Sequence, residues 1–480
     1  MIPPEAWLPA RRVALAMRRP VERFLEIEAA SGIVLLLAAA VAIAWANSPW
    51  AGSYEKLWHT PIRAGVGEWT MERSLHFWIN DLLMTVFFLL AGLEIKREMV
   101  QGALSNVKRA TLPIAAAVGG MVVPAAIYVA LNATGAGARG WGVPMATDIA
   151  FAVGVLVLLG KRVPAALRVL LLAFAIIDDV GAILVIALFY SAGFALAGLA
   201  AAALGVVLLF AFGRIGVRPG VIFVLPLVLL WGGLLHAGIH PTIAGVILGL
   251  AVPTRAWFGR EGFLKVTHRA LRDFQQRAAD NEPDEELLEP LNRIGVAQRE
   301  AVSPALRGET LLHPWVAYGV MPLFALANAG VNLSGIRLGD PGAVAVLGGV
   351  TIGLLVGKPA GVLLASWITV RLRLAALPVG VDWRGMLVVG SAAGIGFTMA
   401  IFIAELAFED QGILTVAKLG ILVATTVAGC FALLAGRMLL PRQQPAEVAS
   451  ITDSSAESST AVWSGTYPAP EAAEPGTGQS

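Results

Sequence analysis

The chain has 480 residues, of which 57% are hydrophobic and only 14% are charged, and its formal net charge is +2. A soluble domain carries about 25% charged residues, because its surface must be hydrated. The composition therefore argues against a soluble enzyme, a disordered scaffold and a nucleic-acid binder. The single cysteine, Cys430, excludes a disulfide framework and a cysteine-based metal site.

The first element is a basic N-terminal segment, residues 1–28, which we expect to be cytoplasmic. It has no apolar stretch close enough to Met1 for an ordinary cleaved signal peptide. The first long apolar run begins at Ala29 and predicts a retained membrane helix. The basic residues of the segment are Arg11, Arg12, Arg18, Arg19 and Arg23.

An apolar stretch of about 18 or more residues with few charges predicts a membrane-spanning helix. Residues 29–440 contain such stretches throughout, some of them shorter, so we expect an all-α polytopic membrane protein with about 12 transmembrane helices. The candidates are 29–46, 78–95, 110–131, 141–160, 165–190, 193–212, 221–235, 240–252, 314–331, 343–370, 385–408 and 412–440.

The basic residues orient these spans. Most of the 35 Lys and Arg residues fall in the N-terminal segment and in every second connection after it. Short cytoplasmic loops accumulate Lys and Arg. Both termini are therefore expected on the cytoplasmic side.

Three segments outside the spans have distinct compositions. Residues 52–74 alternate around Gly65 and Gly67, which favours a small extracytoplasmic β-hairpin. The cytoplasmic loop 255–312 carries charges of both signs, and we expect it to be part helical and part disordered. The tail 441–480 is rich in Ser, Pro, Ala and Glu, and is expected to be a disordered cytoplasmic tail.

Four ionisable residues fall near the middle of their spans: Asp148, the adjacent pair Asp178 and Asp179, and Lys358. The aspartate pair follows Arg168 by about ten residues, which is about 15 Å along a helix and half of the ~30 Å hydrocarbon core. A charge at the centre of a bilayer costs at least ~2.5–3.5 kcal/mol. Such residues either hold helices together or carry a function.

Asp178 and Asp179 cannot share one partner well. Adjacent side chains on a helix diverge by about 100°, so Lys358 cannot neutralise both carboxylates with good geometry. At least one carboxylate must face water, bind a cation or be protonated. Because protons and a hard cation compete for the same oxygens, we predict a site that exchanges protons for a cation. An ion cluster that only joins helices is the alternative.

Two spans contain helix breakers. The fourth has Pro144 shortly before Thr147 and Asp148, and the eleventh has Gly394 and Gly396. Non-helical backbone at this depth occurs only around a protein-lined or water-filled cavity. Each span is the middle one of a trio, 3-4-5 and 10-11-12. We therefore expect inverted-topology repeats with two discontinuous helices, although glycines can also serve close packing alone.

Six segments make the chain, from about residue 22 to 440, resemble the NhaA sodium–proton antiporters, which are themselves built from inverted repeats. Three of the segments contain the four ionisable residues near mid-span, and the other three lie elsewhere in the spans or at their ends. The segments are AGLEIKRE (91–98), VPMATDIAFAVGV (143–155), AIIDDVGA (175–182), GIHPTIAG (238–245), HPWVAYGVMPLFALANAGV (313–331) and VGKP (356–359).

The resemblance implies roles for the central residues. Asp179 resembles the carboxylate that binds sodium and carries a proton, and Asp178 resembles its neighbour that pairs with Lys358 and releases it during transport. Thr147 and Asp148 resemble the unwound segment beside the site, where the acid faces positive helix ends. The expected Na⁺ ligands are Asp178, Asp179 and Thr147.

The resemblance also implies regulation and assembly. Residues of the family's cytoplasmic funnel and a histidine control its response to pH, and they correspond here to Glu94, Arg97, Glu98, Glu309 and His240. The hairpin 52–74 resembles the contact of a homodimer. The expected function is electrogenic, pH-regulated exchange of Na⁺ or Li⁺ for protons in the bacterial inner membrane, with no cofactor and no enzymatic activity.

Other classes of protein place acids in a membrane. An intramembrane aspartyl protease needs two aspartates on different helices, which an adjacent pair fits poorly. A sodium-coupled symporter needs a pocket for an organic substrate, and no polar cluster indicates one. A channel would show flux uncoupled from a proton gradient. Glu405 and Lys418 lie towards the outer ends of their spans, where long side chains can reach the membrane surface, and no role is assigned to them.

Overall fold

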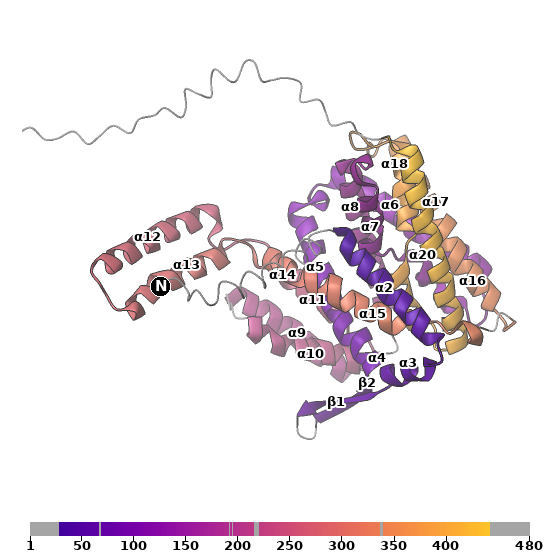
Figure 1. Ribbon diagram of the computed structural model, residues 1–480, viewed down its shortest axis with the longest axis horizontal. Coiled ribbons are helices and arrows are strands. Elements are labelled where there is room, and N and C mark those ends of the chain that lie inside the picture. Colours follow the sequence, from indigo (N-terminus) through magenta and orange to yellow (C-terminus); the bar gives the residue numbers. More distant parts are fainter. Residues whose placement is uncertain are drawn as a thin grey trace, which may run out of the picture. The chain divides into compact units, whose positions relative to one another are not determined.

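A computed structural model describes residues 28–441 apart from 67–68, 192, 194, 216–219 and 337–338 (Figure 1). The basic N-terminal segment, except for its last residue, and the predicted disordered tail beyond residue 441 lie outside the described residues. The described chain is a bundle of helices with one two-stranded sheet, and it belongs to a unit that ends at Leu440.

Long apolar helices dominate the described residues. Eight of them are long and apolar enough to cross a membrane, or up to ten if each of two bent helix pairs counts as one span. The bent pairs are Ala30–Ala46 with Ala51–Trp58, at 116°, and Trp383–Ala393 with Phe397–Ala407, at 46°. A mostly helical, multi-pass membrane protein is thus confirmed, whereas the number of twelve spans stays a prediction.

The elements before the charged connection are interrupted by short 3₁₀ and π segments. The α-helices are α2 (Glu28–Ala46), α3 (Ala51–Trp58), α4 (Leu75–Phe77), α5 (Met84–Gln101), α6 (Val107–Leu131), α7 (Ile149–Leu158), α8 (Ala165–Phe189), α9 (Leu196–Ile215), α10 (Val224–Ala237) and α11 (Ile243–Ala251). The short segments are the π-helix η1 (Trp78–Leu83) and the 3₁₀ helices η2 (Ala103–Ser105), η3 (Ala138–Met145), η4 (Gly160–Arg162) and η5 (Gly220–Phe223).

The remaining elements are likewise α-helices with short 3₁₀ and π segments between them. The α-helices are α12 (Gly259–Ala279), α13 (Asp284–Glu300), α14 (Pro304–Trp315), α15 (Met321–Asn328), α16 (Ala343–Ile352), α17 (Lys358–Arg371), α18 (Trp383–Ala393), α19 (Phe397–Ala407) and α20 (Gln411–Leu439). The short segments are the π-helices η6 (Val316–Val320) and η8 (Gly353–Gly357) and the 3₁₀ helix η7 (Leu333–Gly335).

Small residues let the helices that carry the central charges approach closely. A Cβ atom on Gly119 of α6 would lie 2.2 Å from the carbonyl oxygen of Gly361 on α17, so only glycine fits there. Such contacts are typical of membrane helices, which associate by packing rather than by the hydrophobic effect. They allow α17, the helix that contains Lys358, to pack closely against α6.

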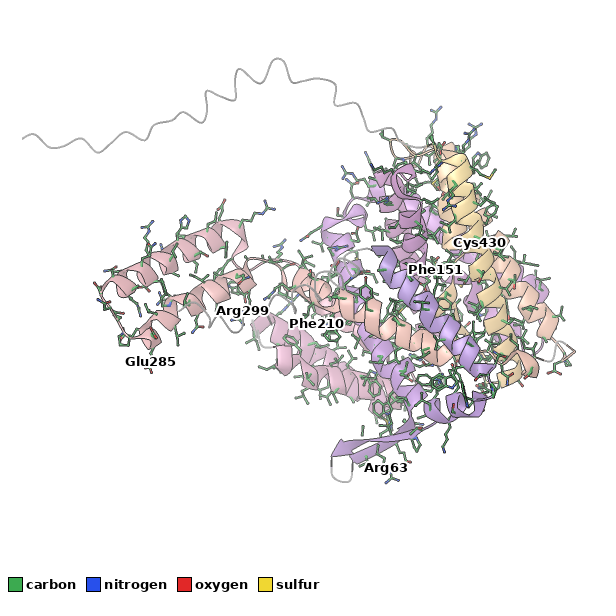
Figure 2. The ribbon with its side chains drawn as sticks, in the orientation of Figure 1. Arg63, Phe151, Phe210, Glu285, Arg299 and Cys430 are labelled. Atoms are coloured by element: carbon green, nitrogen blue, oxygen red, sulfur yellow. The ribbon has the colours of Figure 1, made fainter. Side chains whose placement is uncertain are left out.

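Two separate groups of buried side chains hold the bundle. The larger group spans most helices, whereas a smaller one joins α9, α10 and α11 through Ala202, Leu209, Leu230, Leu234 and Ala244. Apolar side chains such as Phe210 on α9 remain exposed, and Cys430 of α20 is exposed as well (Figure 2). Exposed apolar surface of this kind is expected where lipid replaces water.

Residues 52–74 form a hairpin only in part. Strands β1 (Pro61–Val66) and β2 (Trp69–Ser74) pair antiparallel, with Pro61 opposite Ser74 and Val66 opposite Trp69. The prediction of strand from residue 52 is wrong, because residues 51–58 form α3. Tyr54 and Trp58 are four residues apart and both are buried, so a helix places them on one face, where Tyr54 also contacts Trp45 with ring centroids 5.6 Å apart.

The charged connection contains α12 and α13 and runs into α14. The expected helical part is confirmed, whereas partial disorder stays a prediction. Arg277 of α12 links this helix to α13, since its Nη2 lies 2.9 Å from a carboxylate oxygen of Glu289. Its Nε lies 3.2 Å from Asp273 on α12 itself. Figure 2 marks α13 by Glu285 near its start and Arg299 near its end.

Candidate functional site

The candidate site lies where two helix interruptions meet. Between η3 and α7 the backbone of residues 146–148 is extended, and α18 and α19 are separated by residues 394–396. The Asp148 amide donates to the Ile395 carbonyl at 2.7 Å, and the Thr147 hydroxyl donates to the Ala393 carbonyl at 2.9 Å. Each interruption therefore satisfies polar groups of the other, as buried non-helical backbone requires.

Gly394 is needed for space rather than for conformation. A Cβ atom on this residue would lie 2.6 Å from the carbonyl oxygen of Leu354, which belongs to the π-helix η8. Glycine therefore lets the interruption of α18 and α19 lie directly against the segment that leads into Lys358. π-helical segments of this kind are frequent at functional sites.

Asp148 links the first turns of two helices. One of its carboxylate oxygens accepts from the Phe151 amide of α7 at 3.1 Å, and the other accepts from the Thr398 amide of α19 at 3.2 Å. The Thr398 hydroxyl donates to the same oxygen. Helix N-termini carry partial positive charge, so this buried carboxylate lies between two positive helix ends.

Lys358 forms a fully buried ion pair with Asp178. Its Nζ atom lies 2.8 Å from Asp178 Oδ2, and neither side chain is exposed. The same ammonium donates to the carbonyl of Met145, the last residue of η3. A buried ion pair is tolerated only when further hydrogen bonds satisfy its remaining polar atoms, and the interrupted helix supplies one of them here.

Asp179 is next to this pair and is also buried, with 4% of its surface exposed. Its Oδ1 and the Oδ1 of Asp178 have no hydrogen-bond partner among the described protein groups. Buried polar atoms are nearly always paired, so the two unpartnered carboxylate oxygens need an explanation. Each oxygen, taken by itself, is suited to hold a proton or to contribute to binding a hard cation.

Four of the residues assigned to pH regulation gather between α5 and α14. Arg97 forms an ion pair with Glu309, and its Nη2 lies 3.5 Å from Glu98 Oε1. Glu94 is one turn earlier on α5, on the same face. The fifth, His240, has other neighbours.

His240 contacts a carboxylate that the sequence reasoning missed. Its Nε2 lies 3.6 Å from Asp81 Oδ1 in η1, and its Nδ1 lies 2.7 Å from the Thr242 hydroxyl. Asp81 is mostly buried and lies inside a predicted span. The search for acids within spans that identified Asp148 applies equally to Asp81.

The sequence reasoning gave no role to three further, mostly buried polar residues. Thr398 follows the glycine interruption directly, which is the signal that points to it. Glu405 and Lys418, whose long side chains can reach the membrane surface from the outer ends of their spans, are only 15% and 13% exposed here and pair with each other at 2.5 Å. A count along the span gives depth, but not the direction of a side chain.

Comparisons with known proteins identify the family of the chain. The structure of the sodium proton antiporter MjNhaP1 from Methanocaldococcus jannaschii aligns with 86% of this chain and 92% of that chain, at 13% identity and a TM-score of 0.41, a likeness too low to carry an argument. The Na⁺/H⁺ antiporter NhaA 2 of Sorangium cellulosum is 58% identical over 95% of this chain and 98% of its own length.

Two further matches extend this result. The Na⁺/H⁺ antiporter NhaA 2 of Myxococcus xanthus is 54% identical over 96% of this chain and 98% of its own length. A family model described as Na⁺/H⁺ antiporter 1 matches residues 22–435. The resemblance to NhaA antiporters is thereby confirmed, and the chain belongs to the Na⁺/H⁺ antiporter 1 family.

Proposed function

We propose that this protein is a secondary active transporter that exchanges Na⁺ or Li⁺ for protons across the bacterial cytoplasmic membrane. Family membership supports the exchange. The observation on this molecule that carries the proposal is the buried Asp178–Lys358 pair beside Asp179, whose Oδ1 has no partner among the described protein groups. Adjacent carboxylates on one helix do not favour an aspartyl protease, and we propose no second function.

In the proposed cycle, Na⁺ and a proton compete for Asp179. The proton leaves the carboxylate as Na⁺ binds, and Na⁺ leaves as a proton returns, so the two ions cross the membrane in opposite directions. Na⁺ favours oxygen ligands, and Asp178 and Thr147 provide further oxygens. Na⁺ near Asp178 competes with Lys358 for that carboxylate and releases the lysine towards the Met145 carbonyl, which it already contacts.

The exchange is proposed to be electrogenic. If one Na⁺ is exchanged against protons on two groups, each cycle moves net charge and therefore responds to the membrane potential. Asp179 is one proton carrier in this scheme. Either Asp178 or Lys358 is the second, and Lys358 serves in any case as the counter-ion of Asp178.

The proposed topology has twelve spans, inverted repeats and cytoplasmic termini. The short apolar helices α10 and α11 would add two spans to the ten that length and composition allow. Two similar trios support the repeats: the interrupted stretch η3–α7 lies between α6 and α8 in sequence, and the bent pair α18–α19 lies between α17 and α20. The fourth and eleventh spans are the discontinuous ones in this proposal.

Regulation by pH is assigned to Glu94, Arg97, Glu98 and Glu309, with His240 acting through its contact with Asp81. The ion pair of Arg97 with Glu309 ties α5 to α14, so protonation of the acid would loosen that connection. The hairpin β1–β2 is proposed as a homodimer contact, because a two-stranded sheet leaves both edges open to pairing.

Proteoliposomes that contain the full chain and a pH-sensitive dye test the function. With a proton gradient imposed, addition of Na⁺ or Li⁺ should change the internal pH, whereas K⁺ serves as the comparison cation. Because protons compete with Na⁺, the Na⁺ concentration for half-maximal exchange should rise as the pH falls. No change of internal pH with any alkali cation at any pH would contradict the proposal, and Na⁺ flux without proton movement would indicate a channel.

A further inference from the structure

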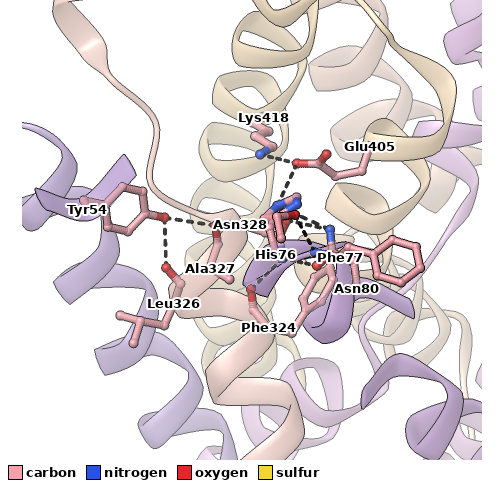
Figure 3. Close-up of polar contacts among 11 residues, drawn as sticks. Tyr54, His76, Phe77, Asn80, Phe324, Leu326, Ala327, Asn328, Glu405 and Lys418 are labelled. Atoms are coloured by element: carbon pink, nitrogen blue, oxygen red, sulfur yellow. Dashed lines mark hydrogen bonds and ion pairs between the residues drawn. The ribbon is translucent and has the colours of Figure 1, made fainter. Parts of the chain in front are cut away.

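A second buried polar cluster lies outside the candidate site (Figure 3). Lys418 of α20 forms an ion pair with Glu405 of α19 at 2.5 Å, and His76 of α4 lies 3.9 Å from the same carboxylate oxygen. Only 29% of the His76 side chain is exposed. A charged cluster inside a membrane domain is expensive, so it is retained for a purpose.

His76 also belongs to a network of amides. Its Nε2 donates to Asn328 Oδ1 at 2.9 Å. Asn328 Nδ2 donates to Asn80 Oδ1 at 2.8 Å, and Asn80 Nδ2 donates back to Asn328 Oδ1 at 3.2 Å. Tyr54 of α3 donates to the Leu326 carbonyl at 2.9 Å. These bonds join α3, α4, η1 and α15 into one group, which we call the scaffold.

The helix α19 connects this cluster to the ion site. Thr398 in its first turn binds Asp148, and Glu405 follows seven residues later, about 10 Å along the helix. Residues 398, 401, 402 and 405 share one helical face. Any movement of the ion site that carries α19 with it therefore moves Glu405 relative to the scaffold.

The structure is closed between the cluster and the site. Ile401 and Phe402 are 0% and 1% exposed. The Phe402 ring contacts Phe88 and Phe324, with centroids 5.6 and 6.1 Å away, and the His240 ring at 5.3 Å. His76 comes two residues after the end of β2. The closed region around Phe402 therefore lies on the side of the bundle to which the hairpin is attached, which we call the hairpin side.

We propose that Glu405 is a positioning residue whose contact with His76 stabilises the conformation closed on the hairpin side. Lys418 orients the Glu405 carboxylate, and both residues move together because they belong to neighbouring helices of one trio. His76 stays with the scaffold. Opening towards the hairpin side would separate His76 from Glu405, so loss of this contact should shift the population towards the open form. The inference rests on the proposed exchange by alternating access.

A cysteine at Ile401 reports this opening. The substitution Ile401→Cys is made in a Cys430→Ser background, since Cys430 is exposed, and labelled in vesicles by a membrane-impermeant thiol reagent. With the cluster intact, labelling from the hairpin side should be slow. Glu405→Gln or His76→Leu should accelerate it at least about tenfold, which corresponds to about 1.4 kcal/mol. His76→Gln keeps an N–H donor for Asn328 but loses the imidazole that faces Glu405, so it should be labelled nearly as fast as His76→Leu.

Glu409→Gln is the matched control, because Glu409 follows α19 directly but is 93% exposed and pairs only at 3.5 Å with Arg139. General loosening would raise labelling from both sides, whereas the proposed contact affects the hairpin side alone. Equal rates for Glu405→Gln and Glu409→Gln, or acceleration from both sides, would overturn the inference. Exchange measured in the same vesicles is a separate test: its absence in the unmodified chain counts against the proposed function, not against the contact.

Discussion

Ion pairs occur in two contrasting regions of this molecule. At the crossing of the interrupted helices, Asp178 and Lys358 are fully buried. In the α12–α13 pair, Arg293 and Glu289 are in contact although their side chains are 53% and 52% exposed. The interaction is chemically the same, but the first pair has lost its hydration and the second has kept much of it.

The contrast shows which ion pairs contribute most to the stability of this fold. Exposed pairs contribute about 0–1 kcal/mol each, because water screens them and also solvates either partner when it is alone. Loss of one partner of a buried pair costs about 3–5 kcal/mol, because the other charge stays buried without compensation. Loss of one partner should therefore matter far more in the buried region than in the exposed one.

The largest effect is expected from Asp179→Asn. The substitution keeps the size of the side chain but removes the charge for which Na⁺ and protons compete in the proposed cycle, so exchange should fall at least about 100-fold, or about 2.7 kcal/mol. Dye-monitored exchange in proteoliposomes measures this. Asp280→Asn, in the turn between α12 and α13, is the control and should exchange normally. Full activity of Asp179→Asn would show that the buried Asp179 carboxylate is no more important for exchange than the exposed Asp280.

Lys358→Ala should affect both folding and transport. It leaves Asp178 buried without its partner, so the free energy of unfolding should fall by about 3–5 kcal/mol. Denaturant unfolding in detergent measures the change. The double substitution Lys358→Met with Asp178→Asn removes both charges and should recover most of the stability while exchange stays lost. A single variant as stable as the unmodified protein would contradict the role of burial.

Thr398→Ala tests the second buried carboxylate of the same region. Asp148 would lose the hydroxyl donor but keep the amide donors of Thr398 and Phe151, so a destabilisation of about 1.5–3 kcal/mol is expected from one charged hydrogen bond. Thr398→Ser retains the hydroxyl and should be close to the unmodified protein. Equal stability of the Ala and Ser variants would show that the hydroxyl contributes nothing.

Arg293→Gln should have the smallest effect. Its contacts with Glu289 and Asp273 are exposed, so the unfolding free energy should change by less than about 1 kcal/mol, and less still at high salt. Thermal unfolding at two salt concentrations measures it. A loss as large as that of Lys358→Ala would remove the contrast between the two regions.

Much of this molecule is predictable from its sequence because the bilayer imposes simple rules. Spans follow from apolar length, and Asp148, Asp178, Asp179 and Lys358 stand out because charge at mid-span is rare. The helix interruptions follow from Pro144 and the glycines. These features are local, so no knowledge of distant contacts is needed to find them.

Apart from the pairing of Asp178 with Lys358, which the family resemblance implied, the partners were not predictable, because they lie far apart in the chain. Lys358 contacts the carbonyl of Met145, and Asp148 contacts Thr398, 250 residues away. Backbone acceptors leave no signature in a sequence. The pairing of Glu405 with Lys418 was not predicted for a related reason: their depth follows from counting, but only the packing of α19 on α20 turns them towards each other. Residues 51–58 were wrongly predicted as part of the hairpin. The alternating pattern around Gly65 and Gly67 was extended back over them, although Tyr54 and Trp58 have the four-residue spacing of a helix.

The hydrogen bonds between the two interruptions have a consequence for the integrity of the chain. Residues 147 and 148 precede the α12–α13 turn and residues 393–398 follow it, so the centre of the protein is assembled from two separate lengths of polypeptide. A protease cut in the turn at residues 280–283 would sever the covalent connection but leave this non-covalent join untouched. The two fragments should therefore copurify as one functional particle.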